Sequence, residues 1–208
     1  MSRVARPREH NEKTRVALRG AAERLGAEGG ADALSVRAVA DAVGTTTRAV
    51  YSLYGSKDGL VDALAQTAFE FLADEIDDLP ETADPATDLI EVGTVFRRLV
   101  REHPALYRIA FQRIVPGLRA GPELTAARER AFAQLQAKIR RVKDADLLGL
   151  KSVRDATVEF NAMLEGLGNA ELRGNVLRIL PTGEEERAWR DALVNVVRGF
   201  GASQAAPS

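Results

Sequence analysis

Residues 34–60 read LSVRAVADAVGTTTRAVYSLYGSKDGL and carry the clearest structural signal in the chain. Their apolar side chains recur at three- and four-residue spacing, which predicts short helices. Ser35 and Thr46 can each cap a helix, because a hydroxyl oxygen accepts an unpaired N–H group of the first turn. Gly44 can adopt the backbone conformation that ends the first helix. The stretch is therefore predicted to form two short helices joined by a glycine turn, a helix-turn-helix.

The helical spacing continues through nearly the whole sequence, and no useful length alternates with the two-residue period of a strand. We therefore predict an all-α fold. The expected helices cover residues 11–27, 35–43, 46–53 and 56–79, a run around 89–100 that ends at the His103-Pro104 break, and residues 126–142, 150–172 and 184–200. The Gly29-Gly30 pair is expected to end the first helix.

The pattern divides the chain into three parts. Residues 1–56 are predicted to form an N-terminal three-helix unit with a basic tail. The fourth helix should join it to a C-terminal helical bundle within residues 57–200. Residues 201–208 lack periodicity and are expected to be disordered.

The composition limits the chemistry that the chain can support. It is 45% hydrophobic, 28% charged and 5% aromatic, as in ordinary folded proteins. With no cysteine and two histidines, the chain has few of the side chains that commonly bind metals, and we expect no metal and no cofactor. No stretch reaches the roughly 18 apolar residues of a membrane span, and no apolar signal core follows the N-terminus, so a cytoplasmic location is expected.

Positive charge is concentrated at the N-terminus. Residues 1–19 carry six basic side chains against Glu9 and Glu12, whereas residues 63–208 carry 19 basic and 22 acidic side chains. A basic terminus suits binding to a phosphate backbone, and a solvated tail explains the same charge. The segment from Arg3 to Arg8 therefore either enters a minor groove or stays in solvent.

The second helix of the helix-turn-helix should be exposed on one side. That side offers polar groups able to bond to phosphates or base edges, namely Thr46, Thr47, Arg48, Tyr51 and Ser52. Short helical hairpins with a glycine turn are common in helical bundles, so this geometry alone does not assign DNA binding.

The downstream residues add specificity. The segment VYSLYGSKDGL (50–60) closely resembles the tyrosine, aromatic, Ser-Lys-acid, Leu signature that follows the recognition helix in the TetR family. TRVALRGAAERLGAEG (14–29) resembles the opening helix of that family, and LSVRAVADAVG (34–44) its second helix and turn. The resemblance spans residues 13–64. It implies a TetR/AcrR-type regulator with a DNA-binding domain at residues 1–56 and a ligand-binding and dimerisation domain at residues 57–200. Such a regulator would be a homodimeric repressor that a small apolar effector releases from a palindromic DNA operator. The alternative is an activator of the same fold.

The resemblance also implies roles for single residues. Arg37 would reach a base or the backbone in the major groove, and Thr47 and Arg48 would read bases. Tyr51 would contact a phosphate. Lys57 would hold a phosphate together with the N–H groups at the start of the fourth helix.

Each of these residues has a simpler explanation. Arg37 can pair with Asp41 four residues on, Tyr51 can be a packing residue, and Lys57 can be a solvated lysine. Tyr54 takes the usual phenylalanine position of the family, which assigns it to the core between the third and fourth helices.

The C-terminal segments HPALYRIAF (103–111) and EGLGNAELRG (165–174) resemble sensor domains of one TetR subgroup. The predicted effector pocket combines apolar side chains with a few polar ones: Phe96, Tyr107, Phe111, Met163 and Leu167 with Gln112, Asn161 and Glu165. These residues fit a plain core equally well. The last helix carries a stripe of Trp189, Leu193, Val196 and Phe200, which is core or dimer seam, with the seam favoured.

Two other classes of protein fit the sequence less well. The sequence contains no nucleophile elbow, phosphate loop or HExxH helix, and His10 and His103 lie far apart, so we predict that the chain is not an enzyme. A helical protein-interaction module is the remaining alternative.

Overall fold

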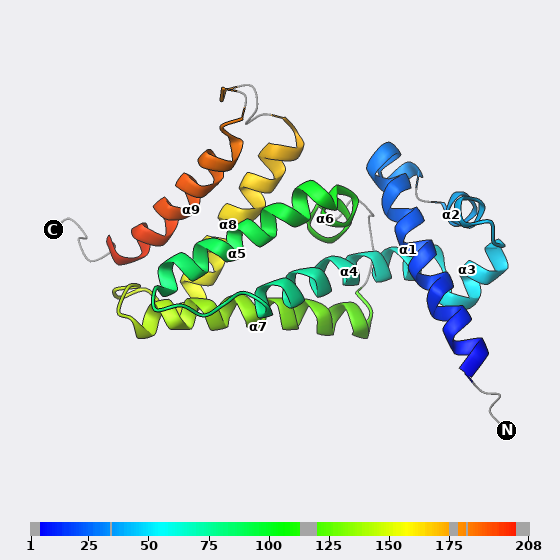
Figure 1. Cartoon of the computed structure of the whole chain (residues 1–208), viewed down its shortest axis with the longest axis horizontal. Coiled ribbons are helices and arrows are strands. Elements are labelled where there is room, and N and C mark those ends of the chain that lie inside the picture. The colour runs from blue at the N-terminus through cyan, green and yellow to red at the C-terminus, as the bar shows by residue number, and fades with distance from the viewer. Residues whose placement is uncertain (1–4, 34, 113–119, 175–178, 182, 203–208) are drawn as a thin grey trace. The chain divides into compact units, whose positions relative to one another are not determined.

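The computed structural model describes residues 5–33, 35–112, 120–174, 179–181 and 183–202, and all regular structure in these ranges is helical. Figure 1 shows the helices along the chain. They are α1 (Ala5–Ala33), α2 (Val36–Val43), α3 (Thr47–Tyr54), α4 (Lys57–Asp77), α5 (Pro85–Glu102), α6 (Pro104–Phe111), α7 (Pro122–Asp144), α8 (Val153–Leu172) and α9 (Glu185–Ala202). The predicted all-α fold is confirmed. No helix among the described residues combines the length and apolar character that a membrane crossing requires.

The chain divides into two compact units. Unit 1 contains Met1–Phe69 and His103–Ala127, and unit 2 contains Glu70–Glu102 and Arg128–Ser208. The continuous helix α4 begins in unit 1 and ends in unit 2. The predicted division of function at residue 56 stays a prediction.

The helix-turn-helix forms with the caps expected from the sequence. Ser35 Oγ accepts the N–H of Ala38 at 3.0 Å at the start of α2. Gly44 ends α2 with a φ of 67°, a left-handed conformation that glycine adopts without steric cost. Val39 and Val50 are fully buried and turn one face each of α2 and α3 inward.

Helix α1 is longer than predicted. The sequence predicts an end before the Gly29-Gly30 pair, but the helix continues through both glycines to Ala33. A glycine costs a helix only about 1 kcal/mol relative to alanine, and Leu18 and Ala22 are fully buried and fix the helix by packing. The Gly-Gly signal is therefore too weak to end it.

Helix α6 is not predicted as a separate element. The His103-Pro104 break ends α5 as expected, and Pro104 also begins α6, where the missing N–H of proline costs nothing. The predicted loop at residues 116–122 ends where α7 begins at Pro122, and its residues 116–119 lie outside the described part of the chain.

The last three helices form close to their predicted bounds. The apolar stripe of α9, however, does not form the dimer seam that the sequence favours. Trp189, Leu193 and Phe200 are buried within a single chain, and Val196 is half-buried. The stripe is therefore core rather than dimer seam. Gly201 and Ala202 continue α9, and the rest of the predicted tail lies outside the described residues.

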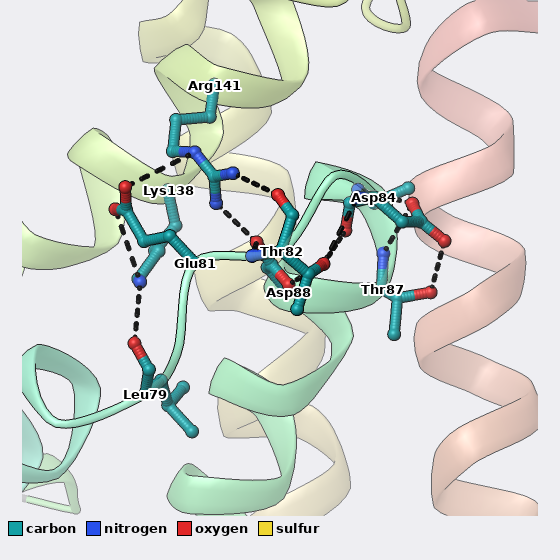
Figure 2. A network of polar contacts seen from close by, with 9 residues as sticks. Leu79, Glu81, Thr82, Asp84, Thr87, Asp88, Lys138 and Arg141 are labelled. Atoms are coloured by element: carbon teal, nitrogen blue, oxygen red, sulfur yellow. Dashed lines mark hydrogen bonds and ion pairs between the residues drawn. The ribbon is translucent and has the colours of Figure 1, made fainter.

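A network of polar contacts fixes the loop between α4 and α5 in unit 2 (Figure 2). The buried carboxylate of Asp88 accepts hydrogen bonds from the backbone N–H of Thr82 at 2.9 Å and from its hydroxyl at 2.6 Å. Arg141 of α7 donates to the same carboxylate and to the Thr82 carbonyl. Burial raises the pKa of Asp88, but the hydrogen bonds from Thr82 and Arg141 outweigh it and hold the pKa below its ordinary value.

Two further contacts complete this network. Lys138 Nζ donates to the carbonyl of Leu79 at 3.3 Å and lies 3.5 Å from Glu81 Oε1 (Figure 2). Asp84 accepts the N–H and hydroxyl of Thr87 at the start of α5, and the hydroxyl bond in particular lowers the pKa of Asp84. The loop is thus held to α5 and α7 by bonds that satisfy its charged groups.

Candidate DNA-binding surface

Helix α3 begins at a capping threonine. Thr46 Oγ1 accepts the N–H of Ala49 at 3.2 Å, so this side chain, predicted to contact DNA, also has a structural role. Its hydroxyl proton is not used by that bond. Thr46 can therefore cap α3 and still donate to a phosphate.

The rest of α3 separates into a buried and an exposed face. Val50 is fully buried, whereas Thr47, Arg48 and Ser52 are exposed and Tyr51 is 51% exposed. In the described part of the chain, no hydrogen bond or ion pair engages these four polar side chains. The exposure of Tyr51 argues against a plain packing role.

Arg37 lies on the exposed side of α2. Its Nε is 3.9 Å from Asp41 Oδ2, and its side chain is 86% exposed. An exposed i,i+4 pair at this distance contributes little to stability. The contact with Asp41 therefore does not prevent Arg37 from binding a phosphate or a base.

The start of α4 presents an N-terminus and a cation together. Ser56 Oγ accepts the N–H of Gly59 at 3.0 Å, and the N–H groups of the two earlier helical residues, Lys57 and Asp58, have no intrahelical acceptor. Lys57, the first residue of α4, is exposed. A helix N-terminus with an adjacent ammonium group is suited to one phosphate.

Tyr54 differs from its predicted role. It is half-buried, and its hydroxyl donates to the carbonyl of Arg15 on α1 at 3.2 Å. A phenylalanine at this position would lack that bond. Tyr54 therefore ties the end of α3 to α1.

Gly59 is a positioning residue that sequence reasoning missed. A Cβ atom at Gly59 would lie 1.9 Å from the carbonyl oxygen of Tyr54, far closer than any side chain permits. Only glycine allows α4 to begin so close to the end of α3. The only sequence signal for this contact is the glycine itself, two residues after Lys57.

The residues predicted to bind an effector are divided between the two units. Tyr107, Phe111 and Gln112 belong to unit 1, where Phe111 stacks on Tyr107 with ring centroids 5.3 Å apart. The others belong to unit 2, namely Phe96 on α5 and Asn161, Met163 and Leu167 on α8. Phe96 and Tyr107 are buried, and Asn161 donates to Glu165 at 2.7 Å. Their role in ligand binding stays a prediction.

Comparison with known protein families gives two matches along the chain. Residues 18–64 match the profile of the tetR family of bacterial regulatory proteins, which includes α2, α3 and the start of α4. Residues 89–196 match the profile of the tetracyclin repressor-like C-terminal domain.

Individual relatives agree with these matches. The HTH-type transcriptional regulator Rv1816 of Mycobacterium tuberculosis is 34% identical over 100 residues, which cover 47% of this chain and 43% of that protein. The fold resembles that of a transcriptional regulator from Rhodococcus sp. Rha1, with 18% identity, a TM-score of 0.73 and coverage of 93% of this chain and 99% of the other. It also resembles RolR in complex with resorcinol, with 17% identity, a TM-score of 0.59 and coverage of 96% and 98%. The chain therefore belongs to the tetR family, whose members are DNA-binding transcriptional regulators of the helix-turn-helix type and not enzymes.

Proposed function

We propose that this chain is a ligand-responsive repressor that binds a palindromic operator as a homodimer and leaves it when a small, largely apolar effector binds. The outward face of α3 is the observation that carries the DNA-binding proposal. Thr47, Arg48 and Tyr51 are exposed and engaged by no hydrogen bond or ion pair among the described residues. Such groups can contact phosphates and base edges without breaking a bond inside the protein.

The proposed contacts follow from the side-chain chemistry. Arg48 reads a base, since a guanidinium can donate two hydrogen bonds to guanine in the major groove. Thr47, the neighbour of Arg48 in α3, and Arg37 on α2 make further contacts in the groove. Tyr51 and Lys57 bind phosphates, which positions α3 without selecting sequence.

The homodimer is proposed to form through α8 and α9. On α8, Val158 is 62% exposed, and the small residues Ala162 and Gly166 continue the same exposed face at four-residue spacing. Asn195 and Gly199 are exposed on α9. Small residues permit helices to approach closely, and two chains would place two recognition helices on successive half-sites. Sedimentation in the presence of operator should give a dimer, and a monomer at micromolar concentration would contradict this part.

The effector is proposed to act through α4. This helix begins at Lys57 and extends from unit 1 into unit 2, so a ligand that tilts it would alter the spacing of the two recognition helices. The structure of RolR with resorcinol is an instance of a small ligand on a similar fold. A coupling of about 1–3 kcal/mol would lower operator affinity roughly 5- to 150-fold.

Selection from a random pool of double-stranded DNA tests the DNA-binding proposal and identifies the operator in the same experiment. The full chain should enrich an inverted repeat whose half-site centres are about 34–36 Å apart, the spacing of one helical turn. Enrichment of no sequence, or of a single asymmetric half-site, would contradict it.

Reciprocal titration tests the effector proposal. A compound that releases the selected DNA should bind the protein more weakly when the DNA is present, by the same factor. Identical ligand affinities with and without DNA would contradict coupling through the protein.

A further inference from the structure

A cavity of about 480 Å³ lies between α5 and α9 in unit 2. Its volume falls within the range of small-molecule sites, roughly 300–1,000 Å³. Its walls combine four arginines with three glutamates and an apolar floor: Glu91, Thr94, Arg97, Arg98, Arg101, Glu102, Glu186, Trp189, Arg190 and Leu193. None of the residues predicted to bind an effector is among them, so this is a separate candidate site.

The floor of the cavity is apolar and closely packed. Trp189 and Leu193 are 2% and 1% exposed. A Cβ atom at Gly93 would lie 2.5 Å from Leu193 Cδ1, so glycine lets α5 and α9 meet here. The guanidinium of Arg97 lies over the Trp189 ring, 5.8 Å from its centroid.

The arginines are unequally paired. Arg97 is buried, and its Nε and Nη2 donate to the two carboxylate oxygens of Glu171 at 3.2 and 3.1 Å. Arg98 pairs with Glu75, and Arg190 pairs with Glu91 at 3.1 Å. These three guanidiniums each have a carboxylate partner.

Arg101 has no carboxylate of its own among the described residues. Its Nε is 3.9 Å from Glu171 Oε1, an oxygen already bound by Arg97. Two guanidiniums thus face one carboxylate, and in the described part of the chain no hydrogen bond engages the guanidinium of Arg101. Glu102 and Glu186 are exposed lining residues, and their charges oppose a ligand with several negative groups.

A second observation points to a missing acceptor. The indole Nε1 of Trp189 is buried and has no hydrogen-bond partner in the described part of the chain. Buried donors are nearly always paired, so such a group needs an explanation. An acceptor oxygen that entered beside Trp189 would satisfy it.

We propose that this cavity binds a small organic acid with one carboxylate and an apolar body. The carboxylate binds Arg101, and the body lies over Leu193 and the edge of Trp189. At about 3.6 residues per turn, Glu186, Arg190 and Leu193 share one face of α9, whereas Asn195 and Gly199 of the proposed dimer seam lie on another. The site is therefore open in both the monomer and the proposed dimer.

The experiment uses Trp189, which is the one tryptophan of the chain. The full-length protein is titrated without DNA with phenylacetate and octanoate and with the matched neutral compounds phenylacetamide and octanamide, by tryptophan emission and by calorimetry. At least one acid should bind saturably, change the emission and bind roughly tenfold or more tightly than its amide, because a charge-assisted hydrogen bond is lost in the amide.

Two variants locate the carboxylate. Arg101→Gln should reduce the affinity for the acid to that for the amide, and folding should be retained because the Arg101 side chain is 61% exposed. Arg187→Gln is the matched control, since Arg187 is an exposed arginine of α9 that pairs with Asp191 and does not line the cavity. Equal affinities for acid and amide, binding that leaves the emission unchanged, absence of binding, or wild-type binding by Arg101→Gln would each overturn the proposal. The titration contains no DNA, so its failure would leave the proposed repressor function intact.

Discussion

The charged side chains of the DNA-binding surface and those of the loop between α4 and α5 differ in their partners. Arg48 and Lys57 are exposed and take part in no ion pair or hydrogen bond among the described residues. Asp88 and Arg141 bond to each other and to Thr82 (Figure 2). A charge that is already bonded inside the fold stabilises it, whereas an exposed, unbonded charge remains available to a second molecule. Whether a charged side chain already has a bonded partner within the fold, rather than its residue type, thus distinguishes structural residues from binding residues.

Removing a charge from the loop should cause the largest loss of stability. Asp88→Ala leaves Thr82 and Arg141 without their acceptor, and we expect the free energy of unfolding to fall by about 1.5–3 kcal/mol, the range for hydrogen bonds to a charged group. Arg141 is partly exposed, which keeps the loss below that of a fully buried pair. Urea denaturation measures it. Asp191→Ala, which removes an exposed carboxylate of α9, is the control and should leave the unfolding free energy unchanged.

Gly59→Ala should disturb the DNA-binding surface without removing any charge. The new Cβ would meet the carbonyl of Tyr54, so the start of α4 must shift, at a cost of about 1–3 kcal/mol for overpacking. Thermal unfolding and DNA affinity should both fall. Gly20→Ala on α1, where a Cβ has ordinary contacts, should be neutral or slightly stabilising. Equal effects of the two substitutions would show that the Tyr54 carbonyl does not exclude a side chain at position 59.

Tyr54→Phe should have a smaller effect. It removes the hydrogen bond to the Arg15 carbonyl while keeping the ring, which should cost about 0.5–1.5 kcal/mol of unfolding free energy. Chemical denaturation measures the change. A variant as stable as the wild type would mean that water replaces the hydroxyl at Arg15 without cost.

The pH dependence of the Asp88 network should be the smallest effect, because a protonated carboxyl keeps part of its bonding. The folded pKa of Asp88 lies below its ordinary value, so its contribution is fully present above the ordinary pKa and is lost as the pH falls through the folded pKa. The difference in unfolding free energy between wild type and Asp88→Asn should therefore shrink between about pH 5 and about pH 3. A difference that stays constant over this range would contradict the assignment.

The helix-turn-helix could be predicted because its signals are local. Ser35 and Thr46 each bond to an N–H three residues ahead, and Gly44 ends α2 through its own backbone. These interactions do not depend on the rest of the fold. The exposed face of α3 follows from the same spacing.

The polar network and the cavity could not be predicted because their partners are far apart in the sequence. Asp88 bonds to Arg141, 53 residues away, and Arg190 pairs with Glu91, 99 residues away. Periodicity identifies the inward face of a helix but not the helix that it meets. For the same reason, sequence reasoning favours the dimer seam over the core for the α9 stripe of Trp189 and misses the contact between Gly59 and Tyr54.

The most direct test of DNA recognition compares Arg48→Ala and Lys57→Ala on selected operator and on random DNA over a range of salt concentrations. Arg48→Ala should weaken operator binding by about 1–3 kcal/mol and affect random DNA much less, because it removes a base contact. Lys57→Ala should weaken both DNAs alike and reduce the salt slope by about one, because it removes a phosphate contact. Equal effects of both substitutions on operator and random DNA would contradict the assignment of base reading to α3 and phosphate binding to the start of α4.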